Sequence, residues 1–253
     1  MSNIEKLIKT VKKLRAQDGC EWDRKQTHET LVPYLLEETY EVIEAIENKD
    51  YTALKEELGD LLLHVIFQAD LAEDNKIFSI EDSINNVNEK LINRHPHIFN
   101  NEDNIKPEDV NWELTKQKEK NRDSVLDGIP IALPALLRAR RIQEKAAGVG
   151  FDWDKKDQVF NKIEEEVGEL KEALNSNNGI EEELGDVLFS VVNLSRHLNL
   201  NPEKTLKLSI EKFSKRFKRI EKDLKNKNIQ MQNLSLKELD AIWEKNKLSD
   251  KTN

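Results

Sequence analysis

The chain has 253 residues, of which 37% are hydrophobic and 35% charged, with a formal net charge of −9 and one cysteine, Cys20. The acidic balance argues against nucleic-acid binding, because phosphate contacts need a basic face. A single cysteine excludes a disulfide within the chain and fits a reducing cytoplasm. The most apolar stretch, 61–67, is interrupted by His64 and is far too short to span a bilayer, so we expect neither a nucleic-acid nor a membrane partner.

Apolar residues recur at helical spacing, and few stretches alternate as a strand requires, so the sequence predicts an all-α fold. Ser235 with Glu238 has the spacing of a capping box. The first half is expected to form helices at 2–14, 35–46, 51–71 and 79–95, and a fifth that starts near Pro107 and carries Trp112. The second half is expected to form helices at 133–147, 155–175, 179–198, 202–225 and 236–247.

The second half of the chain repeats the first. Glu-Glu-Thr-Tyr-Glu at 37–41 precedes Glu-Leu-Gly-Asp at 57–60, and Glu-Glu-Val-Gly-Glu at 165–169 precedes Glu-Leu-Gly-Asp at 183–186. The first glutamates are offset by 128 positions and the last aspartates by 126, so only small loop changes separate the copies. Glycine and proline punctuate the segment between them. The sequence therefore predicts a tandem repeat of two helical-bundle domains, at 1–120 and 134–253, joined by a linker at 121–133.

Each copy of the repeat carries two pairs of carboxylates. Because positions i and i+3 share a face of a helix, the members of a pair point the same way, and two pairs on facing helices converge. Unpaired carboxylates there would repel one another, and a cation that prefers oxygen ligands, Mg²⁺ or its substitute Mn²⁺, would relieve the repulsion. The predicted metal ligands are Glu38, Glu41, Glu57 and Asp60 in the first half and Glu166, Glu169, Glu183 and Asp186 in the second.

Two features argue against the alternative that these acids form a solvated helix surface. Gly59 and Gly185 lie inside the acidic pairs, and because glycine costs helix stability, we expect close helix–helix approach there. Both Glu-Leu-Gly-Asp motifs also run directly into apolar residues, 61–63 and 187–189, which we expect to be buried. A di-iron bundle is disfavoured, because it places histidine three residues after glutamate and the chain has no Glu-x-x-His.

Basic and aromatic residues follow the acids in the same order in both halves. A lysine and an arginine four positions apart come first, and a tryptophan and a lysine four positions apart come next. Cations at a metal-loaded pocket would bind a polyphosphate and an indole could stack on a base, whereas the alternative is surface charge and core tryptophan. The predicted substrate-binding residues are Lys90, Arg94, Trp112 and Lys116 in the first half and Lys212, Arg216, Trp243 and Lys247 in the second.

The two halves differ just beyond the last acid. Four and seven positions after it, the second half has Ser190 and Asn193, whereas the first half has His64 and Phe67. Asn193 could hydrogen-bond a base or sugar, which Phe67 cannot do. We therefore expect the second half to be the main catalytic site and include Asn193 among its substrate-binding residues.

Five strings match one family: Cys-Glu-Trp-Asp at 20–23, Tyr-Leu-Leu-Glu-Glu-Thr-Tyr-Glu at 34–41, Glu-Glu-Leu-Gly-Asp at 56–60, Arg-His-Pro-His at 94–97 and Gly-Val-Gly-Phe-Asp-Trp at 148–153. Together they resemble the MazG family of nucleoside triphosphate pyrophosphohydrolases, as a tandem two-domain form, over nearly the whole chain. One departure is Glu21, where the family more often has proline. This residue lies outside the acidic set.

The resemblance implies helical bundles formed by a homodimer, and Mg²⁺-dependent cleavage of nucleoside triphosphates at the α–β phosphoanhydride to a monophosphate and pyrophosphate. The residues are consistent with this chemistry. Carboxylates that hold a metal would let it orient a water. Lys212 and Arg216 would stabilise charge on the leaving pyrophosphate, and Glu165 or Glu169 would accept the water proton. The alternatives are a non-catalytic nucleotide-sensing regulatory protein and a purely structural helical scaffold.

Overall fold

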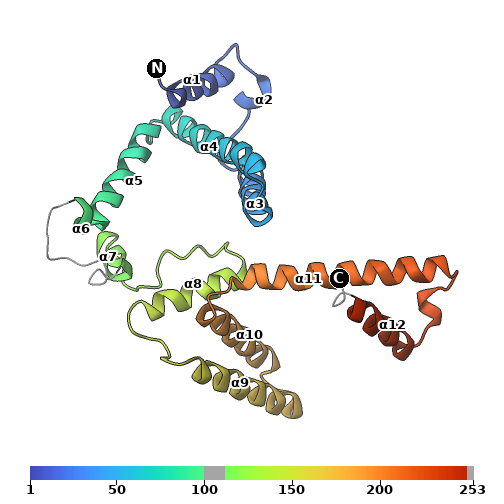
Figure 1. Ribbon diagram of the computed structural model, residues 1–253. Coiled ribbons are helices and arrows are strands. Elements are labelled where there is room, and N and C mark those ends of the chain that lie inside the picture. The colour runs from blue at the N-terminus through green and yellow to red at the C-terminus, as the bar shows by residue number, and fades with distance from the viewer. Residues whose placement is uncertain (100–111, 250–253) are drawn as a thin grey trace. The chain divides into compact units, whose positions relative to one another are not determined.

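In the computed structural model, residues 1–99 and 112–249 are described, and every regular element among them is a helix, which confirms the predicted all-α fold. The chain divides into two compact units, Met1–Pro107 and Glu108–Asn253 (Figure 1). Among the described residues, no helix is both long enough and apolar enough to cross a membrane.

The predicted helices that fall in the described residues are confirmed to within three residues at each end. The capping box before the last helix is confirmed as well, because Ser235 and Glu238 each accept a hydrogen bond from the other's backbone N–H, at 3.4 and 2.8 Å. The predicted helix start near Pro107 lies outside the described residues, and the helix that carries Trp112 is described from that residue onward.

The first unit is built on an antiparallel hairpin of two long helices, α3 and α4. The chain reverses at Lys49, whose φ of 57° lies in the left-handed region, and at Asp50, whose carboxylate caps α4. Helix α1 packs against α4, and α5 follows the far end of α4. The helices of this unit are α1 (Asn3–Arg15), α2 (Glu21–Arg24), α3 (Val32–Asn48), α4 (Tyr51–Asp74), α5 (Ile80–Arg94) and α6 (Pro96–Phe99).

A small apolar core joins α1 to the second half of α4. Arg15 covers one side of it, because its guanidinium lies 5.3 Å from the ring centroid of Phe67 and pairs with Asp70 and, at 2.6 Å, with Asp74. The core therefore lies beyond the acidic part of α4 rather than around it. Its buried members are Val11, Leu31, Ile66, Phe67 and Leu71.

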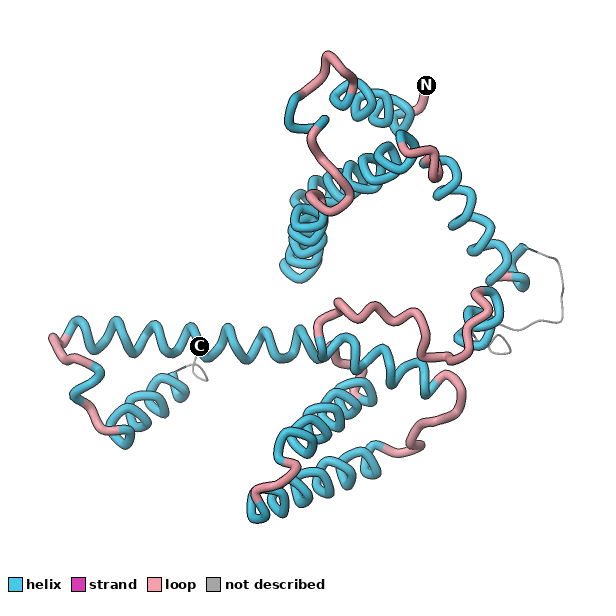
Figure 2. Tube along the Cα trace, turned by 180° about the vertical axis from the view of Figure 1, so that it is seen from behind, coloured by secondary structure: helices cyan, strands magenta, loops and turns pink. Residues whose placement is uncertain are grey.

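The second unit repeats this hairpin with α9 and α10. Left-handed residues again reverse the chain, here Asn177 and Gly179, with φ of 52° and 73°. Helix α11 begins after the end of α10 and leads to α12, which packs against it, as both ribbon views show (Figures 1 and 2). The helices are α7 (Trp112–Glu119), α8 (Ala135–Ala147), α9 (Lys156–Ser176), α10 (Ile180–His197), α11 (Pro202–Asn226), a 3-10 turn η2 (Met231–Asn233) and α12 (Leu236–Ser249).

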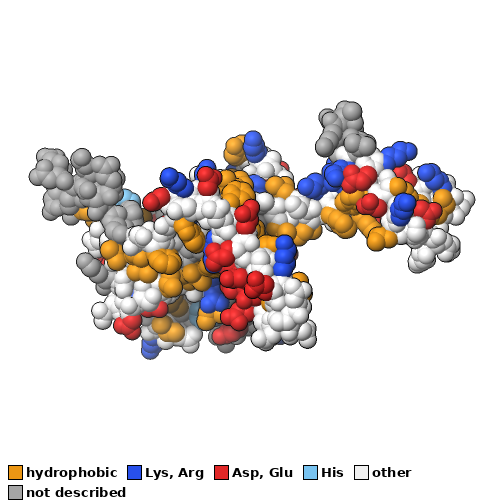
Figure 3. Space-filling view, turned by 90° about the horizontal axis from the view of Figure 1, so that it is seen from below, with side chains coloured by type: hydrophobic (Ala, Val, Ile, Leu, Met, Phe, Trp, Pro, Cys, Tyr) orange, Lys and Arg blue, Asp and Glu red, His pale blue; other side chains and the backbone are white. Residues whose placement is uncertain are grey.

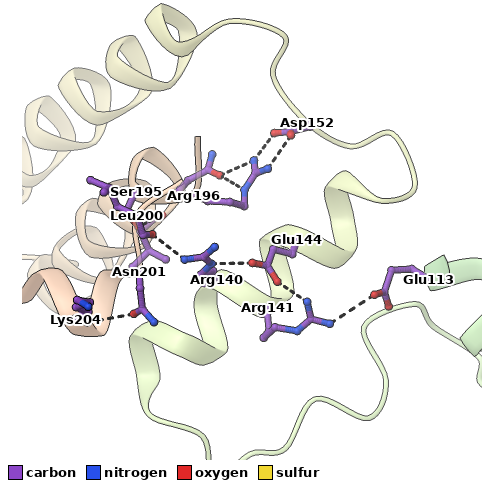
Figure 4. Close-up of polar contacts among 12 residues, drawn as sticks. Glu113, Arg140, Arg141, Glu144, Asp152, Ser195, Arg196, Leu200, Asn201 and Lys204 are labelled. Atoms are coloured by element: carbon purple, nitrogen blue, oxygen red, sulfur yellow. Dashed lines mark hydrogen bonds and ion pairs between the residues drawn. The ribbon is translucent and has the colours of Figure 1, made fainter. Parts of the chain in front are cut away.

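Helix α8 connects the second hairpin to α7. Gln143 of α8 donates a hydrogen bond to the carbonyl of Phe189 on α10 at 2.9 Å. Lys145, only 5% exposed, lies 3.6 Å from Glu113 of α7, and Arg141 lies 3.5 Å from the same carboxylate (Figure 4). The helix that begins at Trp112 therefore packs with the second unit. The domain limits at 120 and 134 stay a prediction.

Two expectations about helix packing are wrong for the described chain. A Cβ added at Gly59 or Gly185 would meet no atom within 4 Å, so no helix approaches closely at either position. The apolar residues after the acids are not all buried either, since Leu62 is 38% exposed and Leu188 is 54% exposed. A hairpin is a single layer of two helices, and each helix covers only one side of its neighbour, so an outer face stays open.

Candidate metal centre

In the second unit, acids from both helices of the hairpin meet. Glu166 comes from the middle of α9, and Glu183 and Asp186 come from the first two turns of α10. One oxygen from each carboxylate lies within 4.8 Å of the other two, and Glu166 is buried. Glu169 lies outside this group of three, but partial desolvation and the charges of Glu166 and Glu183 raise its pKa. Figure 3 shows acidic side chains gathered over this hairpin.

The first unit forms a similar cluster. Glu38 and Glu41 of α3 and Glu57 of α4 place one oxygen each within 4.8 Å of the others. Partial desolvation, followed by the charges of Asp60 and Glu41, raises the pKa of Glu38, and desolvation followed by Glu41 raises the pKa of Glu57. Thus three of the four predicted ligands meet in each unit and the fourth, Asp60 or Glu169, lies near enough to repel them.

A lysine contacts the second cluster, and no sequence motif identified it. The ammonium nitrogen of Lys162 lies 2.7 Å from Glu165 and 2.8 Å from Glu166, and these hydrogen bonds raise the pKa of the lysine. The four-residue spacing of Lys162 and Glu166 on one helix was the available signal. The residue 128 positions earlier is Tyr34, which instead packs edge-on against Trp22 with ring centroids 5.8 Å apart.

Farther along α10, polar residues form a hydrogen-bonded network with Asp152. Asn193 is 5% exposed, and its carboxamide oxygen accepts hydrogen bonds from Arg196 Nε at 3.0 Å and Nη2 at 2.8 Å. Arg196 is in turn held by Asp152, with Nη1 2.8 Å from Oδ2 (Figure 4), and this contact lowers the pKa of Asp152. Because the oxygen of Asn193 is already used, the amide nitrogen is the group that it could offer to a ligand.

The predicted substrate cations of the second unit do not join the acids within one chain. Arg216 lies 5.7 Å from the ring centroid of Trp243, which also packs against Phe213 at 5.0 Å, and Lys247 pairs with Glu244 at 2.9 Å. Lys212 lies one turn before Arg216 on α11. About 16 Å of helix separates Asp186 from the end of α10, where α11 departs. In both ribbon views α12 stands apart from the α9–α10 hairpin (Figures 1 and 2).

The first unit has the same arrangement. Lys90 and Arg94 lie on α5, which starts beyond the end of α4, and about 21 Å of helix separates that end from Asp60. Lys116 lies on α7 in the second unit, paired with Glu113 at 3.1 Å. The side chain of Trp112 lies outside the part of the chain that the structure describes. Each hairpin therefore gathers the predicted carboxylates, but not the predicted cations.

Comparison with known proteins identifies the family. The model of the MazG nucleotide pyrophosphohydrolase domain matches the chain twice, at residues 26–99 and 155–220, so each match contains one acidic cluster. The chain is 49% identical to the nucleoside triphosphate pyrophosphohydrolase/pyrophosphatase MazG of Thermotoga maritima, over 98% of this chain and 97% of that protein. It is 39% identical to the nucleoside triphosphate pyrophosphohydrolase of Escherichia coli K12, over 96% of this chain and 97% of the relative. The chain is thus a tandem member of the MazG family.

Proposed function

We propose that this protein hydrolyses nucleoside triphosphates at the α–β phosphoanhydride, releasing a nucleoside monophosphate and pyrophosphate, with Mg²⁺ as the cofactor and the second unit as the main site. That it is a nucleoside triphosphate pyrophosphohydrolase follows from its family and from relatives of that name that match almost end to end. The observation that carries the cofactor is the meeting of Glu166, Glu183 and Asp186 within 4.8 Å.

The residues present fit Mg²⁺, with Mn²⁺ as a possible substitute. The donors are carboxylate oxygens, which hard divalent cations prefer. Desolvation first, and then the charges of neighbouring carboxylates, raise the pKa values of Glu38, Glu57 and Glu169, and a bound cation would offset both effects. Bound there, Mg²⁺ would offset charge on the phosphates and make a water more acidic. The holding residues would be Glu166, Glu183 and Asp186 in the second unit and Glu38, Glu41 and Glu57 in the first.

The remaining steps fall to the chain's own side chains. Glu169 is the better candidate for the base that takes the water proton, because its raised pKa makes it a stronger base and Glu165 is held by Lys162. The amide nitrogen of Asn193 would donate a hydrogen bond to an acceptor on the base or sugar. Trp243 would stack on the base, and Lys212 and Arg216 would bind the leaving pyrophosphate.

This assignment requires a homodimer. Within one chain the acids of α9 and α10 are separated from Arg216 and Trp243, so a second copy would bring the cations to the carboxylates. The open outer faces support the same conclusion, since Leu184 and Leu188 of α10 are 48% and 54% exposed. Burying such faces in a partner is the usual fate of large apolar patches. We place the dimer in the cytoplasm, where the free thiol of Cys20 remains reduced.

Product analysis tests the reaction. The protein would be incubated with a panel of nucleoside triphosphates and Mg²⁺ in ¹⁸O-labelled water, and the products separated by chromatography and weighed by mass spectrometry. We expect a monophosphate that carries the label, together with unlabelled pyrophosphate. Diphosphate with orthophosphate would instead indicate attack at the γ-phosphate. Nucleotide-dependent stabilisation without turnover would support the alternative of a nucleotide-sensing regulator.

A further inference from the structure

Lys162 occupies an unusual place for a helix-surface lysine. Its ammonium lies 2.7 and 2.8 Å from two adjacent glutamates, and one of these, Glu166, is buried and belongs to the proposed metal-binding group. Helix stability does not account for the pairing of Lys162 with Glu166. On a helix, a lysine four residues before a glutamate stabilises less than a glutamate four residues before a lysine. What the pair does provide is a positive charge against Glu166, whose other carboxylate neighbours are Glu183 and Asp186.

We propose that Lys162 is a built-in counter-ion of the second unit: it neutralises Glu166 while no divalent cation is bound, and it must leave Glu166 when one binds. This inference rests on the proposed function, in which Glu166 holds Mg²⁺. The hydrogen bond to Glu166 engages Oε1, and a cation and an ammonium cannot share the same charge without repelling each other. Part of the free energy of cation binding is therefore used to displace the lysine.

The first unit provides the contrast. The carboxylates of its cluster, Glu38, Glu41 and Glu57, form no ion pair with a lysine or arginine among the described residues. The position that matches Lys162 holds Tyr34, which contacts Trp22. The two clusters therefore differ in the metal-free state. In the second cluster an ammonium neutralises one of the three carboxylates, Glu166, whereas no lysine or arginine in the part of the chain that the structure describes contacts the first cluster. The second cluster is therefore expected to bind a divalent cation more weakly than its carboxylates alone would allow.

The test measures Mn²⁺ binding to the full chain by isothermal titration calorimetry, without nucleotide. All variants also carry Glu57→Gln, which disables the first cluster and leaves one site to titrate. Lys162→Met should tighten the dissociation constant about three- to fivefold, the upper part of the range expected for losing a competing, partly exposed ion pair. Lys162→Arg should stay close to the parent. Lys171→Met is the matched control, because it removes the same charge from the opposite side of α9, and should change the constant less than about twofold.

Thermal unfolding supplies a second readout. In excess chelator, Lys162→Met should unfold at a lower temperature than the parent, and saturating Mn²⁺ should remove most of that difference. An Mn²⁺ constant for Lys162→Met that equals that of Lys171→Met, or is weaker than that of the parent, would overturn the inference while leaving the metal site intact. A parent that binds no Mn²⁺ would overturn both the inference and the proposed cofactor.

Discussion

The two hairpins present the same acids but surround them differently. In the first unit, Glu38, Glu41 and Glu57 repel one another, and the pKa values of Glu38 and Glu57 are raised. In the second, Glu166 is neutralised by Lys162. Two copies of one carboxylate pattern therefore carry different net charges when no metal is bound. The motif therefore sets where a cation can bind, whereas the neighbouring residues set the charge of the site when no cation is bound.

The residues that follow the acids on α4 and α10 also differ between the two units. Asp70 and Arg196 stand at matched positions of α4 and α10, 126 residues apart, and carry opposite charges. Asp70 pairs with Arg15, which lies over Phe67 at the edge of an apolar core. Arg196 instead fixes the carboxamide of Asn193. In the first unit this position therefore supports packing, whereas in the second unit it fixes the polar side chain of Asn193.

The largest effect should come from removing the divalent cation. With excess chelator, pyrophosphate release should fall at least about 100-fold, because the carboxylates would then repel a polyphosphate and no Lewis acid would offset its charge. Readdition of Mg²⁺ should restore it. A steady-state assay with and without chelator checks this, and full turnover in chelator would show that neither cluster needs a divalent cation for catalysis.

A smaller effect is expected on the unfolding temperature in chelator, where the two clusters should respond differently to the loss of one carboxylate. Partial desolvation and then Asp60 and Glu41 raise the pKa of Glu38 above its ordinary 4.5, so the folded chain favours the protonated form, and this stability is lost as pH rises through the raised pKa. Glu38→Gln should therefore raise the unfolding temperature in chelator at pH 7 by about 1–4 °C. The gain should shrink toward pH 4, where Glu38 itself is protonated.

Glu166→Gln is the matched comparison for that measurement. It removes a carboxylate that Lys162 already neutralises, so in chelator at pH 7 the variant should show no gain in unfolding temperature. Scanning calorimetry of both variants at pH 7 and pH 4 provides the check. Equal gains from the two substitutions would mean that the lysine does not distinguish the clusters.

The smallest predicted effect transfers the lysine to the first unit. Tyr34→Lys should give Glu38 a counter-ion four residues away and weaken Mn²⁺ binding at the first cluster about threefold. The titration is done in a chain that also carries Glu183→Gln, so that only the first cluster binds. Tyr34→Met is the control for losing the contact with Trp22. Tighter binding by Tyr34→Lys than by Tyr34→Met would contradict the counter-ion account.

Sequence patterns predicted the helices and the meeting of the acids because both depend on local spacing. Glu183 and Asp186 share a face of α10 whatever the rest of the chain does. The direction of α11 depends on how the turn after His197 packs, which no periodicity encodes, so the separation of Arg216 from the acids was not predicted. The close approach expected at Gly59 and Gly185 was wrong because glycine inside a helix does not by itself specify a neighbour.

The contacts of Lys162 and Asn193 show a different limit. Lys162 lies four residues before Glu166, a spacing that predicts contact on a helix. Among many charged residues, one such pair does not indicate a site unless the surrounding carboxylates are known. Arg196 bonds to Asn193, three positions away, and to Asp152, 44 positions away. The contact with Asp152 exists only in the folded chain. The sequence therefore predicted the location of the site better than its electrostatics.

The most direct test of the central claim, that the second unit carries the chemistry, is steady-state pyrophosphate release by Glu183→Gln and Glu57→Gln. Each substitution keeps the side-chain shape and removes one carboxylate from one cluster. Circular dichroism confirms that both variants remain folded. We expect Glu183→Gln to lose most turnover, at least about 100-fold, and Glu57→Gln to retain much of it. Equal losses would mean two comparable sites, and a selective loss in Glu57→Gln would contradict the assignment.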